Sequence, residues 1–230
     1  MSVTVASVIS RVQTVLQDTT GVRWPQNTEL VLWVNDAQRE VALLKPDASA
    51  TNSTIQLVDG TKQSIPTSGN RLLKVVRNMS SAASNATGKR SVRLVDREVL
   101  DAQTPDWHDP SAAAGDAAHA AVVKHYIYDE ANPRNFYVYP GVTGNAYLEV
   151  IYSANPPTVT ASDNLSVPDI FANAVMNYVL YMAYMKDAEY AGNAQRAANH
   201  YQLFTASVTG KGQVDALTNP NVERRTPAAV

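Results

Sequence analysis

The sequence predicts an α+β protein: a helical bundle formed by the N- and C-terminal segments, an inserted antiparallel β-rich domain, and an extended C-terminal arm. Apolar residues recur at helical spacing near both ends, short alternating runs fill the middle, and the last stretch is polar and interrupted by prolines. We place the two parts of the bundle at 1–50 and 161–212, the β-rich domain at 51–160 and the arm at 213–230.

The first two helices are expected within residues 1–50. Thr4 suits the N-cap of the first helix, and Gly21 follows its end. In the second helix, Asn27 is the expected N-cap, and Pro46 disfavours helix at the residue before it. The apolar stripe of the second helix is predicted at Leu30, Trp33, Val34, Ala37, Val41 and Leu44. Leu32 and Leu43 lie off this stripe, so a second face of the helix is also partly apolar.

Strands and turns are expected from about residue 51 to residue 157. Alternating apolar residues on both sides of Asp59-Gly60 predict a tight hairpin. Two apolar runs, 71–77 and 90–95, flank a polar loop. Residues 125–140 are typical of two strands joined by a turn at Asn132-Pro133, and residues 146–153 complete the set.

Two further helices are expected in the C-terminal part. One begins at Pro168, a residue that suits the first turn, and extends to Met185. The other runs from about Ala194 and ends near Gly210. A single helix cannot bury its own apolar stripe, so each of the four needs a partner. We therefore expect the four helices to pack together as a bundle built from both ends of the chain.

The composition narrows the function. The 230 residues carry a net charge of −2 and only 17% charged residues, which argues against a general nucleic-acid coat. There is no cysteine, which excludes a disulfide scaffold and a thiolate metal site. We find no signal peptide, no membrane span, and no motif for a nucleophile, phosphate or zinc site. We therefore expect no enzyme activity, no cofactor and no membrane partner.

A series of motifs in order along the chain carries a family resemblance. The motifs are W-P-Q-N-T-E-L-V-L-W-V-N-D-A-Q-R-E-V, K-P-D-A, G-T-K-Q-S-I-P, R-E-V-L-D-A-Q-T-P-D-W, Y-D-E-A-N-P-R-N-F-Y-V-Y-P and K-D-A-E-Y-A-G-N. Together they cover nearly the whole chain, which resembles the head-to-tail adaptor (connector) proteins of tailed bacteriophages, particularly short-tailed ones.

The resemblance implies a structural virion protein at the head–tail junction, assembled in the host cytoplasm. Proteins of this kind form a closed ring, commonly of twelve copies, beneath the portal protein and above the tail nozzle protein. The genome passes through the ring, so contact with double-stranded DNA is transient and non-specific. The resemblance supplies no catalytic residues, and roles for single residues rest on physical arguments.

A ring requires two different surfaces on each subunit. Candidates for the subunit interface are apolar or tyrosine side chains beyond a single core stripe: Leu32, Leu43, Tyr178, Tyr181, Tyr184 and Tyr190. The alternative is that they complete the core of the monomer, because periodicity alone does not separate a core from a subunit contact.

The C-terminal arm is the candidate for docking to the portal. An extended segment adds along a partner surface, and the Arg224-Arg225 pair suits acidic groups. The residues assigned to this docking arm are Asp215, Leu217, Asn219, Val222, Arg224 and Arg225. The alternative is a solvated tail without a partner.

Two polar stretches in the middle of the chain admit a functional and a structural interpretation. One is a basic run of Lys89, Arg90, Arg93 and Arg97. Its side chains contact DNA phosphates or the carboxylates of a neighbouring subunit, or they form a solvated strand face. The loop D-A-Q-T-P-D-W-H-D-P offers acids for metal binding or hydrolysis: Asp101, Asp106 and Asp109, with His108. Turn chemistry anchored by Trp107 is the structural interpretation of this loop.

The runner-up function is a carbohydrate-binding or hydrolytic tail component. Its sugar platform consists of the aromatic residues of the predicted strands: Tyr126, Tyr128, Phe136, Tyr137 and Tyr139. A sheet core explains most of the same residues.

Overall fold

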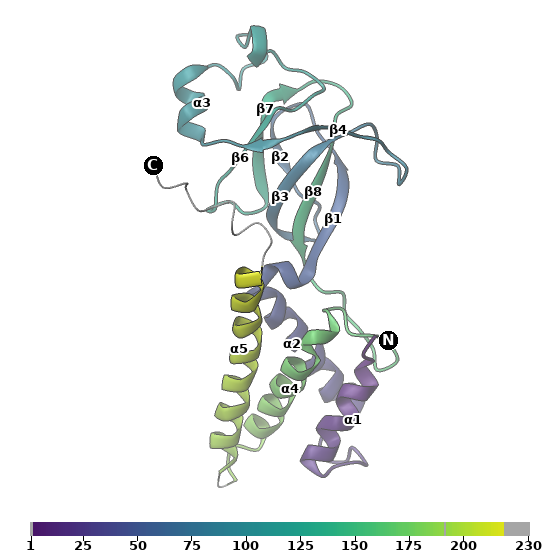
Figure 1. Cartoon of the computed structure of the whole chain (residues 1–230). Helices are drawn as coiled ribbons and strands as arrows, with labels where there is room; N and C mark the ends of the chain where they lie inside the picture. The colour runs from purple at the N-terminus through teal and green to yellow at the C-terminus, as the bar shows by residue number, and fades with distance from the viewer. Residues whose placement is uncertain (1, 191, 219–230) are drawn as a thin grey trace. The chain divides into compact units, whose positions relative to one another are not determined.

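The computed structural model describes residues 2–190 and 192–218. These described residues form two compact units, one from the residues before 50 and after 155 and the other from residues 50–155. The predicted α+β fold is confirmed, with helices at both ends of the chain and an inserted, mainly antiparallel β region (Figure 1).

The first unit is a helical bundle. Its elements are α1 (Val5–Leu16), a π-helical turn (Gln26–Leu30), α2 (Val31–Leu44), two 3-10 turns (Pro46–Ser49 and Asp169–Phe171), α4 (Ala172–Lys186) and α5 (Asn193–Thr218). Helix α4 packs against α1, α2 and α5 (Figure 1). Their apolar faces form one buried cluster, which includes Val8, Leu30, Val34, Val175 and Phe204.

Helix α1 begins as predicted. The Thr4 hydroxyl accepts a hydrogen bond from the Ser7 amide, which satisfies one of the free donors of the first turn. The helix ends at Leu16, and the C-cap residue Gln17 adopts a left-handed conformation (φ 56°) in which its amide donates to the Gln13 and Thr14 carbonyls.

Helix α2 begins differently from the prediction. Asn27 lies inside the π-helical turn and does not act as the N-cap; the turn is entered from Pro25, whose carbonyl accepts from the Glu29 and Leu30 amides. The predicted apolar stripe is buried at its centre but not throughout, because Trp33 is only partly buried and Leu44 is exposed.

Residues from opposite ends of the chain hold the bundle together. The buried Asn35 carboxamide accepts from the Val159 amide at 2.8 Å and donates to the Val159 carbonyl at 3.0 Å. Gln38, also buried, accepts from the Ser166 amide at 2.5 Å. Near the N-terminus, the Asp169 carboxylate accepts from the Val3 amide. The α2 face is thereby joined to the segment that returns from the inserted unit.

Helix α5 is longer than the sequence predicts. It continues through Gly210 and Gly212 to Thr218, so residues 213–218, which we expected to begin the extended arm, are helical. Asp215 and Leu217 therefore belong to α5. The other predicted arm residues, Asn219, Val222, Arg224 and Arg225, lie outside the described residues.

The second unit contains two four-stranded sheets. The strands are β1 (Ala50–Gln56), β2 (Gly60–Ser64), β3 (Gly69–Met79), β4 (Gly88–Ser91), β5 (Arg93–Leu94), β6 (His125–Tyr128), β7 (Asn135–Val142) and β8 (Tyr147–Ala154). The strand orders are β1-β8-β3-β4 and β2-β7-β6-β5, and all pairs are antiparallel except β5 with β6. Hairpins β3–β4 and β6–β7 occur where the sequence predicts them.

One apolar cluster draws residues from both sheets, so the sheets pack face to face. Leu148 and Val150 come from one sheet, and Phe136 and Val138 from the other; all four are fully buried. The opposite face of the second sheet is covered by the segment 95–124, which contains α3 (Arg97–Gln103), a 3-10 turn (Gly115–Ala117) and the buried Trp107.

The prediction of a hairpin at Asp59-Gly60 is wrong. Gly60 does adopt a positive φ (102°), as a tight turn requires, but β1 pairs with β8 and β2 pairs with β7. The turn leads the chain from one sheet to the other. The buried Gln63 side chain holds it, by accepting from the Val58 amide and donating to the Val58 and Gly60 carbonyls.

Candidate assembly surfaces

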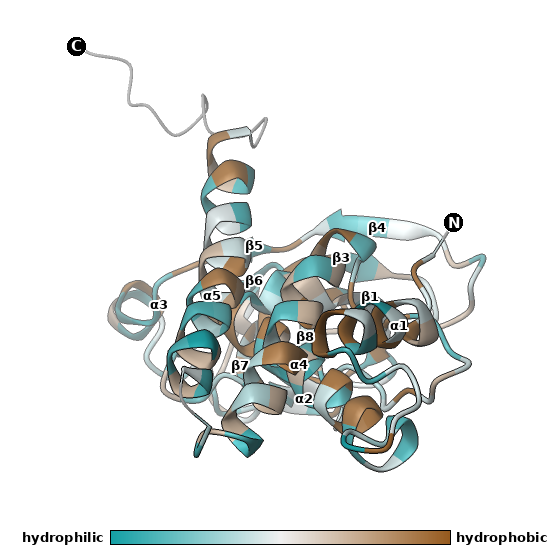
Figure 2. Cartoon of the chain, turned by 90° about the horizontal axis from the view of Figure 1, so that it is seen from below, coloured by the Kyte–Doolittle hydropathy of each residue, from teal (hydrophilic) through white to brown (hydrophobic). Residues whose placement is uncertain are grey.

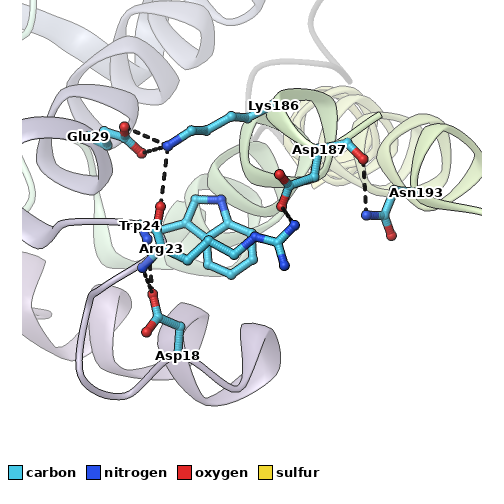
Figure 3. A network of polar contacts seen from close by, with 7 residues as sticks. All are labelled: Asp18, Arg23, Trp24, Glu29, Lys186, Asp187 and Asn193. Atoms are coloured by element: carbon cyan, nitrogen blue, oxygen red, sulfur yellow. Dashed lines mark hydrogen bonds and ion pairs between the residues drawn. The ribbon is translucent and has the colours of Figure 1, made fainter. Parts of the chain in front are cut away.

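A network of polar contacts joins the loop after α1 to the turn between α4 and α5 (Figure 3). The Asp18 carboxylate accepts from three successive amides, those of Val22, Arg23 and Trp24. The bond from the Trp24 amide contributes most to lowering the pKa of Asp18 below its ordinary value. Asp18 thus fixes the loop from which Arg23 extends.

Arg23 and Lys186 complete this network. Arg23 pairs with Asp187 at 2.7 Å and lies over the rings of Trp24 and Tyr190. Lys186 pairs with Glu29 at 2.7 Å and donates to the Arg23 carbonyl (Figure 3). The start of α2 and the end of α4 are therefore fixed side by side, and the Tyr190 ring beside them remains mostly exposed.

Two of the predicted interface residues lie on the outer face of α2. Leu32 is 53% exposed and Leu43 is 72% exposed, whereas Val34 and Val41 on the opposite face are buried. Between the two leucines, Asp36 and Arg39 form an ion pair at 2.9 Å. The described residues thus leave this face of α2 open to a partner.

The predicted interface tyrosines of α4 contact α5 within the same chain. Tyr178 packs on Phe204, Tyr181 on Tyr201 and Tyr184 on His200, with ring centroids 5.0–5.6 Å apart. Burial, followed by the nearby Glu40 and Asp36 carboxylates, raises the pKa of Tyr178 to about 12. All three rings are partly buried and join α4 to α5.

The C-terminal part of α5 is tied to the end of α2 by charge. The buried Lys45 pairs with Asp47 at 2.6 Å and with Asp215 at 3.0 Å, and Asp215 also bonds Lys211. Burial by itself lowers the pKa of Lys45, but the two carboxylates outweigh it, and the net pKa is raised. Asp215, predicted as a docking residue, thus also has a structural role inside the bundle.

The basic run is distributed over three elements of the second unit. Lys89 and Arg90 lie on β4, Arg93 on β5 and Arg97 in α3, and all four side chains are exposed. Of these, Arg97 is engaged by Asp101 at 3.2 Å and lies over the Tyr137 ring. Lys89, Arg90 and Arg93 are the members that remain candidates for contact with DNA phosphates or a neighbour.

The acidic loop after α3 is held by turn contacts. Asp101 accepts from the indole Nε1 of the buried Trp107, and this bond, with Arg97, lowers the pKa of Asp101. Asp109 accepts from the Ser111 amide, and His108 bonds Thr61 at 2.8 Å. In the part of the chain that the structure describes, no group of acids and histidines is arranged to hold a metal ion.

The aromatic residues of the predicted sugar platform are mostly buried. Tyr126, Phe136 and Tyr139 belong to the two cores of the second unit. Tyr128 and Tyr137 line a depression of about 500 Å³ whose other walls include Asp96, Arg97, Asp129 and Glu130. A continuous aromatic platform of these five residues is therefore not present.

Sequence reasoning missed the outer face of α5. Leu203 and Val214 are each 53% exposed and Leu217 is 82% exposed, and hydrophobic bands recur along α5 as far as its C-terminal end (Figure 2). The helix was expected to end near Gly210, which hid the continuation of this face. The 3.6-residue period beyond Gly210 was the signal that could have revealed it.

Comparison with known proteins identifies the family. Among the described residues, no helix is long and apolar enough to span a bilayer. A search of curated proteins found no match. A family model described as SU10 adaptor protein matches residues 3–225, nearly the whole chain. The chain therefore belongs to the SU10 adaptor protein family, and it is a phage adaptor protein of the virion.

Proposed function

We propose that the protein forms a closed ring, a dodecamer by family resemblance, that joins the portal to the tail nozzle in a short-tailed phage. The family match over residues 3–225 is the observation that carries this proposal. The exposed leucines on the outer face of α2 support it, since a ring subunit needs apolar surface outside its own core.

Docking to the portal is assigned to the end of the chain beyond Thr218. Residues 219–230 are polar, contain Arg224-Arg225, and follow the exposed Leu217 at the end of α5. A single arm binds weakly because ordering it costs conformational entropy. Many arms on one ring act together, and the effective concentration strengthens the attachment.

Genome passage requires a bore to which DNA does not adhere. The near-neutral net charge of −2 suits this requirement, because strong binding of duplex DNA comes from many phosphate contacts. Lys89, Arg90 and Arg93 are the side chains we assign to transient contact with DNA or with a neighbouring subunit.

Light scattering after size-exclusion chromatography tests the ring. The protein mixed with the portal of its own phage should elute as a complex with a closed ring of copies, and electron microscopy should resolve that ring on one face of the portal. A polysaccharide-cleavage assay and a glycan array should give no signal. A chain that stays monomeric beside the portal, or cleavage that depends on Asp101, would contradict the proposal.

A further inference from the structure

The outer face of α5 has the pattern of a helix-packing seam. Buried residues of α5 lie on one face, at Ala197, Phe204 and Val208. On an adjacent face of α5, positions alternate at spacings of four and three residues, as in a coiled-coil seam: Leu203, Ser207, Gly210, Val214 and Leu217. Nothing among the described residues covers the two ends of this seam, where Leu203 and Leu217 are exposed.

The centre of the α5 seam is shallow. Gly210 weakens a helix relative to alanine, yet a Cβ atom built there meets nothing within 4 Å in the same chain. No contact inside the chain therefore requires glycine at this position. Ser207, one turn earlier, is also small, so a large side chain from another helix fits between Leu203 and Val214.

The outer face of α2 has the complementary shape. Leu32 and Leu43 are eleven positions apart, as are Leu203 and Val214, which gives both pairs a separation of about 16.5 Å along the helix axis. Between the α2 leucines lies the Asp36–Arg39 ion pair, whose side chains are large and exposed. The bulky centre of α2 thus corresponds to the shallow centre of α5.

The charges of the two faces are also complementary. The α2 face and its flank carry Asp36 and Glu40 against the single positive charge of Arg39, and Glu29, just before α2, is already paired with Lys186. Arg196 lies on the α5 seam, seven residues before Leu203, and within the described ranges no carboxylate pairs with it. In a register that sets Leu203 against Leu32, Arg196 lies about one helical turn before Glu29, so the α5 seam brings a positive charge to the region just before α2.

Helices α2 and α5 run in the same direction within one chain. Lys45, just after α2, pairs with Asp215 near the end of α5. At the opposite end, Glu29, just before α2, pairs with Lys186, and Asn193, the first residue of α5, donates to the carbonyl of the adjacent Asp187. The starts of α2 and α5 therefore lie near each other, as their ends do. Neighbours in a ring of many copies are related by a small rotation, so α5 of one copy and α2 of the next also run roughly parallel.

We propose that the α5 seam of one copy packs against the outer face of α2 of the next copy around the ring. This inference rests on the proposed ring function. The parallel arrangement places Leu203 against Leu32 and Val214 against Leu43, with Arg39 over Gly210. Because the two faces are different surfaces of the same subunit, each copy contacts two neighbours, and the contact repeats around a closed ring.

Cysteine cross-linking tests this contact, because the native chain contains no cysteine. Rings assembled on the portal from an equal mixture of Leu32→Cys and Leu203→Cys chains should give disulfide-linked dimers on oxidation, and each variant alone should give none. A chain with both substitutions should give a ladder of longer multimers. The pair Leu43→Cys with Leu203→Cys is the register control and should cross-link at least tenfold less.

The outcomes separate the interface from the ring. Rings that form normally but cross-link through neither pair, or through the control pair instead, overturn the inferred contact and leave the ring intact. Failure of the unsubstituted chain to form any ring overturns both proposals.

Gly210→Leu gives a second test that does not depend on oxidation. A Cβ atom at this position meets nothing within 4 Å in the same chain, so the melting temperature of the variant should not fall, while ring assembly should drop at least tenfold. Gln202→Leu, an exposed position on α5 away from the seam, is the matched control and should assemble normally. Normal assembly of Gly210→Leu would overturn the inferred packing.

Discussion

The Asn35 carboxamide makes both hydrogen bonds to the backbone of Val159 that a neighbouring β-strand would make. The two residues are separated by the whole inserted unit, and both sites are buried. This pair joins α2 to the returning chain and so brings the helices from the two ends of the sequence into one bundle.

Replacing Asn35 by alanine should destabilise the first unit by about 1–3 kcal/mol or more, because the Val159 amide and carbonyl then lose their partner. Urea unfolding measures the change. Asn70→Ala is the control: its carboxamide also bonds another segment, at Asn155, but it is exposed, and we expect a change within about 0.5 kcal/mol. Equal effects of the two substitutions would contradict the role assigned to Asn35.

Two leucines at the start of α2, one buried and one exposed, should respond differently to truncation. Leu30→Ala removes a fully buried side chain and should cost about 2–5 kcal/mol. Leu32→Ala, on the exposed face, should change the stability of the isolated chain by no more than about 0.5 kcal/mol. A large loss of monomer stability from Leu32→Ala would mean that this face is already covered within the chain.

Asp18 should make the stability of the bundle depend on acid pH. The pKa of Asp18 is lowered in the folded state. Its contribution to the free energy of unfolding is therefore complete above the pKa of the unfolded chain, about 3.9, and is lost as the pH falls through the folded pKa. Asp18→Asn should therefore be less stable than the native chain at neutral pH.

The difference between Asp18→Asn and the native chain should shrink below about pH 3.9, measured by urea unfolding across the acid range. Asp106→Asn, at an exposed position, is the control for a general loss of negative charge. A difference that stays constant down to about pH 3 would argue against the carboxylate as the cause.

Two truncations separate the proposed docking arm from the end of α5. A chain ending at Thr218 should keep its melting temperature and bind the portal at least tenfold more weakly, a loss of about 1.4 kcal/mol. A chain ending at Gly212 also loses Asp215, one of the two carboxylate partners of the buried Lys45, and should melt at a lower temperature. Unchanged portal affinity after truncation at Thr218 would remove the docking assignment.

The sequence by itself determined the features that depend on local physical chemistry. The helical spacing of Leu30, Val34 and Val41, the Thr4 cap and the β6–β7 turn all fix structure within a few residues of themselves. The α+β class and the two-ended bundle follow from these patterns, because amphipathic elements need a partner for their apolar faces.

Only the tertiary structure decided which elements become partners. The turn at Asp59-Gly60 formed, but its strands joined different sheets, where β1 pairs with β8 and β2 pairs with β7, both distant in the chain. Similarly, α5 continues past two glycines where Asp215 reaches the buried Lys45. Strand partners of this kind depend on contacts between residues distant in the chain, and no local pattern encodes them. The end of α5 has a local signal in its helical period, but the contact with Lys45 is again one between distant residues.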